Sequence, residues 1–131
     1  MRYLLDSHTM LWFVSNSDKL SSEAKDLITS PDSELIISIS SIWEISIKYG
    51  LGKLEIKGGY DSLEDVIVLN KIDIMPIEFE HTRKQAVLPH YHKDPFDRMI
   101  ISQAICEEID VISIDSQFDK YFEGERVKRI W

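Results

Sequence analysis

Acidic side chains that could bind a metal ion occur in four separate segments of the chain, and the most distinctive segment is His92-Lys93-Asp94-Pro95-Phe96-Asp97-Arg98. Asp94 followed by Pro95 predicts a helix N-cap with proline at the first helical position, where its missing N–H costs nothing. Asp97 then falls in the first turn, where it can bond back to the cap or favour the positive end of the helix dipole. The local sequence leaves capping and metal binding open, and Asp97 is our candidate ligand.

Asp6 and Asp115 each stand at the end of a predicted strand. The apolar run Arg2 to Leu5 precedes Asp6, and the run Val111 to Ile114 precedes Asp115. A helical pattern from His8 to Val14 follows the first of these acids. Asp6 is therefore equally suited to cap that helix and to act as a ligand.

The fourth acid, Glu44, lies in a helix predicted over residues 40–50. The β-branched, apolar run at 34–39 precedes this helix and is typical of a strand buried on both faces. Ser41 and Glu44 have capping-box spacing, which gives Glu44 a structural role in the first helical turn as an alternative. Trp43 on the same helix is expected to pack inward; the alternative is an exposed apolar platform for a partner helix, with Leu11, Trp12 and Trp43 as candidates.

The rest of the chain also alternates between the two kinds of element. Further helices are predicted at residues 22–29, 61–69, 79–88, 96–107 and 116–122, and further strands at 72–77 and 127–130. Such alternation calls for a parallel sheet with helices on both faces, a three-layer α/β/α domain in which every strand-to-helix turn lies on one edge. All four acids belong on that edge. They meet if the first and fourth strands are neighbours, at the switch point where open sheets bind ligands.

Composition is that of a single-domain soluble protein. The 131 residues, 44% of them hydrophobic, are enough to bury a real core. The one cysteine, Cys106, offers no disulfide and no cysteine-based metal cluster. Because no signal-peptide pattern and no apolar run near ~18 residues occurs, we expect a cytoplasmic protein with no membrane partner. The formal net charge of -8 argues against a broad basic surface for nucleic acid.

Four clustered carboxylates would repel one another strongly unless they raise each other's pKa or hold a cation. An all-oxygen cluster suits Mg²⁺ or Mn²⁺, which usually keep several waters and bridge to phosphate oxygens. Hydrolysis of a phosphodiester follows as the chemistry, with water oriented for in-line attack. His90 and His92 are spaced to hold a transition metal, but the absence of a cysteine or third histidine nearby disfavours that alternative.

Several segments together carry a family resemblance: Leu4-Leu5-Asp6-Ser7-His8, Ser41-Ile42-Trp43-Glu44-Ile45 with Gly52-Lys53-Leu54, residues 92–98, and Ile112-Ser113-Ile114-Asp115. With them the chain resembles PIN-domain ribonucleases of the VapC toxin group, for which the Asp-Pro-Phe-Asp-Arg run is specific. The resemblance implies one domain over residues 1–131 with five parallel strands in the order 3-2-1-4-5. It implies an RNA-cleaving enzyme that uses Mg²⁺ or Mn²⁺. The acids that match the family's catalytic metal ligands are Asp6, Glu44, Asp97 and Asp115.

The resemblance also implies partners for the chain. These are an RNA substrate, a small antitoxin protein that plugs the site, and a second copy in a homodimer. Asp94 and Asp119 are extra acids that could join the metal site. His92 and Arg98 could contact phosphate, or could simply pack or pair at the rim.

Other functions fit the same residues. A PIN-domain nuclease that processes RNA without an antitoxin would keep the four acids, and the neighbouring reading frame would distinguish it. A non-catalytic interaction module would use the acids as helix caps and would bind Mn²⁺ poorly. A phosphate-transferring receiver or a phosphatase is disfavoured because Asp6 lacks the second acid, adjacent or next but one, that such sites need.

Overall fold

Five short strands form the centre of the molecule in the computed structural model, which describes residues 1–131. They are β1 (Arg2–Leu5), β2 (Glu34–Ser38), β3 (Asp73–Met75), β4 (Asp110–Ile112) and β5 (Arg129–Ile130). All pairs are parallel, and the spatial order is β3-β2-β1-β4-β5. This order confirms the predicted sheet and makes β1 and β4 neighbours.

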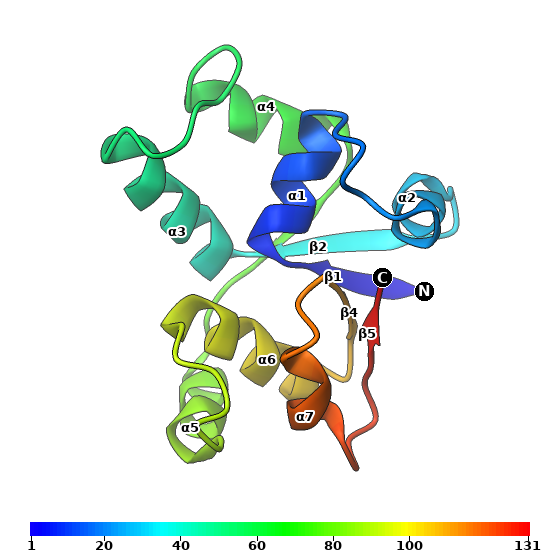
Figure 1. Ribbon diagram of the computed structural model, residues 1–131, viewed down its shortest axis with the longest axis vertical. Coiled ribbons are helices and arrows are strands. Elements are labelled where there is room, and N and C mark those ends of the chain that lie inside the picture. Colours follow the sequence, from blue (N-terminus) through cyan, green and yellow to red (C-terminus); the bar gives the residue numbers. More distant parts are fainter.

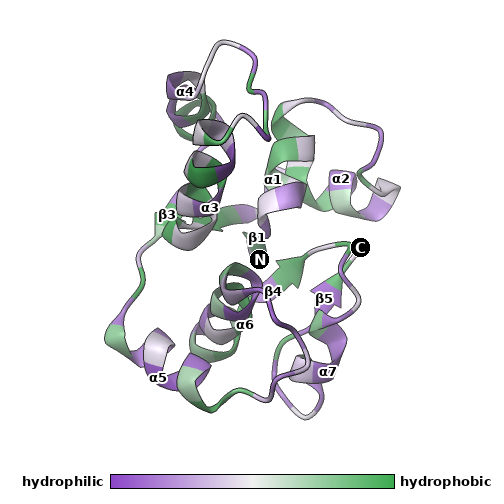
Figure 2. Cartoon of the chain, turned by 60° about the vertical axis from the view of Figure 1, so that its left-hand side comes forward, coloured by the Kyte–Doolittle hydropathy of each residue, from purple (hydrophilic) through white to green (hydrophobic).

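Seven helices cover the two faces of the sheet (Figure 1). They are α1 (Ser7–Val14), α2 (Ser22–Thr29), α3 (Ile39–Gly50), α4 (Asp61–Leu69), α5 (Phe79–Val87), α6 (Pro95–Glu107) and α7 (Phe118–Phe122). The first four pack on one face, and α6 and α7 pack on the other with α5 against α6. Figure 2 shows the same two groups of helices from another side. Its colours show that the helices contain both hydrophobic and hydrophilic residues. None of the helices is long and apolar enough to cross a membrane.

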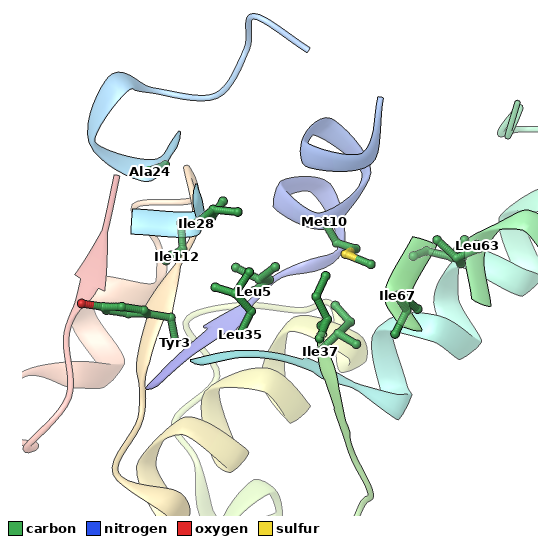
Figure 3. Packing of buried hydrophobic residues seen from close by; sticks show 12 residues of the cluster. Tyr3, Leu5, Met10, Ala24, Ile28, Leu35, Ile37, Leu63, Ile67 and Ile112 are labelled. Atoms are coloured by element: carbon green, nitrogen blue, oxygen red, sulfur yellow. The ribbon is translucent and has the colours of Figure 1, made fainter. Parts of the chain in front are cut away.

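The alternation of side chains along the strands divides the core into two clusters. In β1, Tyr3 and Leu5 join the cluster under α1 to α4, whereas Leu4 joins the cluster under α6 and α7. Because both faces are covered, such a strand is apolar throughout. Figure 3 shows the first cluster, in which Leu5 and Ile37 lie near Met10 of α1. Leu5 is fully buried, so its replacement by alanine would cost about 2–5 kcal/mol.

The carboxyl ends of the parallel strands lie at one edge of the sheet, and three helices begin there. α1 follows β1 directly with Asp6 as its N-cap, and α3 follows β2 directly with Ser38 as its N-cap. α6 has the predicted start, with Asp94 as N-cap and Pro95 at its first position. This arrangement places the acids of four segments on a common edge.

Several strands are shorter than the sequence predicts. β3 ends at Met75 because Pro76 has no N–H to donate to a sheet ladder. β4 ends at Ile112, and Ile114, which was expected in the strand, is half exposed. The acid that follows, Asp115, is therefore presented from a turn after the strand.

Candidate acidic active site

Asp6 has one of the two roles that its sequence position allows, that of the helix cap. Its Oδ1 accepts the backbone N–H of Thr9 at 2.8 Å, which confirms the predicted cap of α1. Its Oδ2 accepts the hydroxyl of Ser113. The residue is only 3% exposed. An ionised carboxylate offers about four lone-pair positions, so these two bonds leave capacity for a cation on both oxygens.

Ser113 connects Asp6 to Asp115. Its hydroxyl donates to Asp6 Oδ2 and accepts the backbone N–H of Asp115 at 3.0 Å. Asp115 Oδ1 accepts the backbone N–H of Gln117 at 2.9 Å, so its own turn fixes the carboxylate. Sequence analysis missed Ser113. The available signal was a polar residue within the apolar run Val111 to Ile114, two positions before an acid.

Glu44 lies in the second turn of α3, and not in the first turn as the sequence predicts. The predicted capping box is wrong because Ser38, the last residue of β2, caps the helix by accepting the backbone N–H of Ser40 at 3.0 Å. The hydroxyl of Ser41 is instead buried without a hydrogen-bond partner. Glu44 therefore has no capping role.

The contacts of Glu44 join it to the edge that holds Asp6. Its Oε1 accepts the hydroxyl of Ser7 at 2.6 Å, and Ser7 directly follows Asp6. Its Oε2 pairs with Lys48 Nζ, one turn later in α3, at 3.0 Å. Glu44 is 5% exposed. A carboxylate this buried requires a partner charge, and Lys48 is the one that the chain supplies.

His92 joins Asp97 to Asp115. Its Nε2 lies 2.9 Å from Asp115 Oδ2 and 3.1 Å from Asp97 Oδ2. Asp97 lies in the first turn of α6, as predicted. The contacts of His92 and the hydrogen bonds of Ser113 therefore link Asp6, Asp97 and Asp115 in one continuous network.

The electrostatics of Asp97 place it close to the remaining acids. Burial, together with the charges of Asp94, Asp6 and Glu44, raises its pKa to about 7, against a lowering effect of His92. Each acid acts on Asp97 only over a short range in a partly buried site. Asp6 and Glu44, from two other segments of the chain, are therefore near enough to Asp97 to disfavour its charge.

Two further candidate acids have partners of their own. Asp94 Oδ1 accepts the backbone N–H of Phe96 at 2.8 Å, which confirms it as the cap of α6. It is near enough to raise the pKa of Asp97, and a ligand role for it stays a prediction. Asp119 forms a two-pronged ion pair with Arg129, at 2.9 and 3.1 Å, and its carboxylate is committed to β5.

Arg98 does not lie at the rim of the acidic edge. It is 6% exposed, and its guanidinium donates to the carbonyl oxygens of Pro89 at 2.7 Å and Gln85 at 3.1 Å. It also donates to the Tyr121 hydroxyl at 3.2 Å. Five fixed N–H donors suit this role, in which Arg98 satisfies carbonyls of the segment that leads into α6. The packing alternative for Arg98 is the one that the structure favours over phosphate contact.

Trp43 is 60% exposed, so the prediction that it packs inward is wrong. The buried face of α3 consists of Ser41, Glu44 and Ile45 among others, and Trp43 points away from it. Its ring meets that of Phe96 edge to face, with centroids 5.4 Å apart. These two aromatic residues directly precede Glu44 and Asp97 in the chain, so they border the acidic edge.

The donor chemistry of this edge fits a hard divalent cation. Carboxylate oxygens converge there from separate elements, and burial and the neighbouring acids disfavour the ionised form of Asp97, which a bound cation would stabilise. Such a set of oxygen ligands is the kind that Mg²⁺ and Mn²⁺ prefer. Of the four predicted ligands, Asp97 and Asp115 offer oxygens within 4.8 Å of each other, in a group with His92. That Asp6 and Glu44 would complete the set that holds the ion stays a prediction.

Solved structures of toxin-antitoxin complexes share the fold of this chain. VapBC-1 from nontypeable Haemophilus influenzae matches with a TM-score of 0.73 and 12% identity, covering 99% of this chain and 97% of that chain. VapBC2 from Rickettsia felis, bound to a promoter DNA fragment, matches with a TM-score of 0.70 and 18% identity, covering 99% and 98%. VapBC-5 from Mycobacterium tuberculosis matches with a TM-score of 0.65 and 14% identity, covering 98% and 97%.

Sequence comparison identifies the family. No curated protein matches the chain at the level of sequence. The model of the PIN domain family, in contrast, matches residues 3–123, a span that contains all four candidate acids. The sheet order and the acidic edge agree with this match. The chain therefore belongs to the PIN domain family of nucleases.

Proposed function

We propose that this protein is a metal-dependent endoribonuclease that acts as the toxin of a toxin-antitoxin pair. The observation that carries the proposal is the convergence of carboxylates from β1, α3, α6 and the turn after β4 on one edge of the sheet. The full-length similarity to the VapBC structures supports the toxin assignment.

The protein's own residues prepare the site for a cation. The hydroxyl of Ser113 donates a hydrogen bond to Asp6, and that of Ser7 donates one to Glu44. These bonds fix the directions of the two carboxylates. Asp97 must lose the proton that its raised pKa retains before it can bind the ion. When bound, Mg²⁺ or Mn²⁺ supplies Lewis-acid stabilisation of the charge that develops on phosphate oxygens and lowers the pKa of attacking water.

The test of the nuclease proposal is cleavage of RNA by the purified protein. We expect cleavage with Mg²⁺ or Mn²⁺, products that carry a 5′-phosphate, and no cleavage in EDTA. A DNA strand of the same sequence serves as the matched substrate control. Undiminished cleavage of RNA in EDTA would contradict the role of the metal.

A groove beside the acidic edge supports an antitoxin as partner. It has a volume of about 490 Å³ and is lined by Leu11 and Trp12 of α1, by Lys48 of α3 and by residues 53–57. Lys48 reaches Glu44, so the groove adjoins the acids. An amphipathic partner helix could lay its apolar face there. An arginine at its end could then bind the carboxylates in a two-pronged manner.

The exposed side of α3 supports the homodimer. Ile39, Trp43 and Ile47 follow one another at helical spacing and are 40%, 60% and 38% exposed. A stripe of this kind on a helix marks an interaction surface. Light scattering should give the mass of a dimer, and Trp43→Glu should shift it to that of a monomer.

A further inference from the structure

His92 lies between two of the acids, and its role depends on which of its ring nitrogens carries the proton. Its Nε2 and the carboxylate oxygens of Asp97 and Asp115 lie within 4.8 Å of one another, close enough to surround an ion. An unprotonated Nε2 would be a metal ligand. A protonated Nε2 would instead donate a hydrogen bond to the carboxylates.

The second ring nitrogen settles this choice. The backbone N–H of Asp94 donates to His92 Nδ1 at 3.1 Å, so Nδ1 uses its lone pair in that bond and carries no proton. The proton of the neutral ring is then on Nε2, which faces Asp97 and Asp115. Coordination through Nε2 would move the proton to Nδ1, where it would oppose the N–H of the residue that caps α6.

Contacts with Tyr121 and Phe118 of α7 also fix the position of His92. The backbone N–H of His92 donates to the Tyr121 hydroxyl at 2.8 Å, and that hydroxyl donates to the Pro89 carbonyl at 2.8 Å. The imidazole packs edge to face on Phe118, with ring centroids 6.3 Å apart. His92 is thus anchored to α7 and to the start of α6, and its side chain is only 13% exposed.

We propose that His92 is a positioning residue: its Nε2–H bridges Asp97 and Asp115, fixes the two carboxylates relative to each other, and stays outside the coordination shell of the ion. The proposal rests on the metal-dependent function proposed above. It has a chemical consequence, because a shell made only of oxygen ligands suits Mg²⁺ or Mn²⁺, whereas a nitrogen ligand would favour Zn²⁺ or another transition metal.

Two spectroscopic measurements test the position of the proton and the ligand set. ¹⁵N-detected NMR of the metal-free protein should show the Nε2–H tautomer for His92. Electron spin-echo spectroscopy of the protein with Mn²⁺ should show no directly coordinated nitrogen. An Nδ1–H tautomer, or a coordinated nitrogen in the Mn²⁺ spectrum, would overturn the proposal. Failure to bind Mn²⁺ at all would contradict the proposed function, while the NMR result would still decide the tautomer.

A matched pair of variants tests the donor at Nε2. Glutamine places an amide N–H₂ near the position of Nε2, whereas asparagine places it near Nδ1. We expect His92→Asn to weaken Mn²⁺ binding by roughly 10–100-fold, as loss of an outer-shell partner does, and His92→Gln to retain most of the affinity. The exposed His90 supplies the control, since His90→Asn should bind as the wild type does.

The choice of metal separates a positioning role from a ligand role. A donor acts on the ion through the carboxylates, so His92→Asn should weaken Mn²⁺ and Zn²⁺ binding by a similar factor. Loss of Zn²⁺ binding alone, or equal losses for His92→Asn and His92→Gln, would identify a nitrogen ligand instead. Thermal unfolding of the metal-free variants shows whether each one folds.

Discussion

Asp97 is the residue on which burial and charge act together. Because its pKa is raised to about 7 from 3.8, the native state binds more protons than the unfolded chain between about pH 4 and pH 7. The stability of the metal-free protein therefore declines as the pH rises through this window. The penalty is fully present above pH 7, where Asp97 is ionised in both states.

The first prediction follows for Asp97→Asn. The variant should be more stable than the wild type at pH 8 in EDTA, by on the order of 1 kcal/mol or more, since each pKa unit is worth about 1.4 kcal/mol. At pH 4 the difference should largely vanish. Urea unfolding at both pH values measures this, and an equal difference at the two values would contradict the assigned pKa.

A second prediction separates Asp97 from Asp94, which both occur in the start of α6. Asp97→Asn should abolish cleavage because a neutral amide is a poor replacement for a metal-binding carboxylate. Asp94→Asn should retain activity, since asparagine caps a helix about as well as aspartate. Cleavage rates with Mn²⁺, beside thermal unfolding of both variants, measure the effect. Loss of activity in Asp94→Asn alone would reverse the two assignments.

At the scale of elements, the alternation of strands and helices was sufficient to predict which edge holds the acids. Parallel strands place every strand-to-helix turn on one side, so Asp6, Asp97 and Asp115 could be placed without side-chain detail. The neighbouring positions of β1 and β4 came from the family resemblance. These features depend on the hydrophobic pattern of whole segments, which can be recognised in the sequence.

The features that the sequence did not predict depend on where each element ends. The sequence predicted a capping box at Ser41, whereas the helix begins directly after Ser38, the last ladder position of β2, which is the actual cap. That shift moved Glu44 into the second turn and left Trp43 exposed. The bond from Ser113 to Asp6 spans 107 positions and exists only once β1 and β4 are in register.

The third prediction concerns that link between two strands. Ser113→Ala leaves Asp6 Oδ2 and the backbone N–H of Asp115 without their partner. We expect a loss of about 1–3 kcal/mol in the free energy of unfolding, together with weaker Mn²⁺ binding. Ser116→Ala, at an exposed position in the same turn, is the control. Unchanged stability and Mn²⁺ affinity in Ser113→Ala would show that the link has no role.

For the whole molecule, the distribution of charge limits how the proposed RNA substrate and partner protein would approach. The net charge is -8, yet Lys48, Lys53 and Lys57 line one groove with a single carboxylate, Glu55. An acidic protein attracts a polyanion only where local cations outweigh its overall charge. The same groove is apolar enough for a protein helix. Substrate and antitoxin would therefore compete for neighbouring parts of one surface.

The last prediction tests inhibition by such a partner. Co-expression with the adjacent small open reading frame should yield a complex without nuclease activity if, as we propose, an arginine of the partner binds the carboxylates of the acidic edge. An arginine-to-alanine scan of the partner should restore cleavage at one position and leave measurable binding. If no arginine matters, direct blocking of the acids is wrong.

The groove itself is tested by a matched pair of substitutions in this chain. Leu11→Glu places a charge in the groove and should weaken the complex without abolishing cleavage by the free enzyme, whereas Val68→Glu, at a 71% exposed position outside the groove, should bind the partner normally. Thermal unfolding of both variants shows whether the partly buried Leu11 position tolerates the change. The arginine scan of the partner tests contact with the acids, and the Leu11→Glu and Val68→Glu pair tests contact with the groove. A partner that inhibits from another surface would still inhibit the enzyme in both experiments.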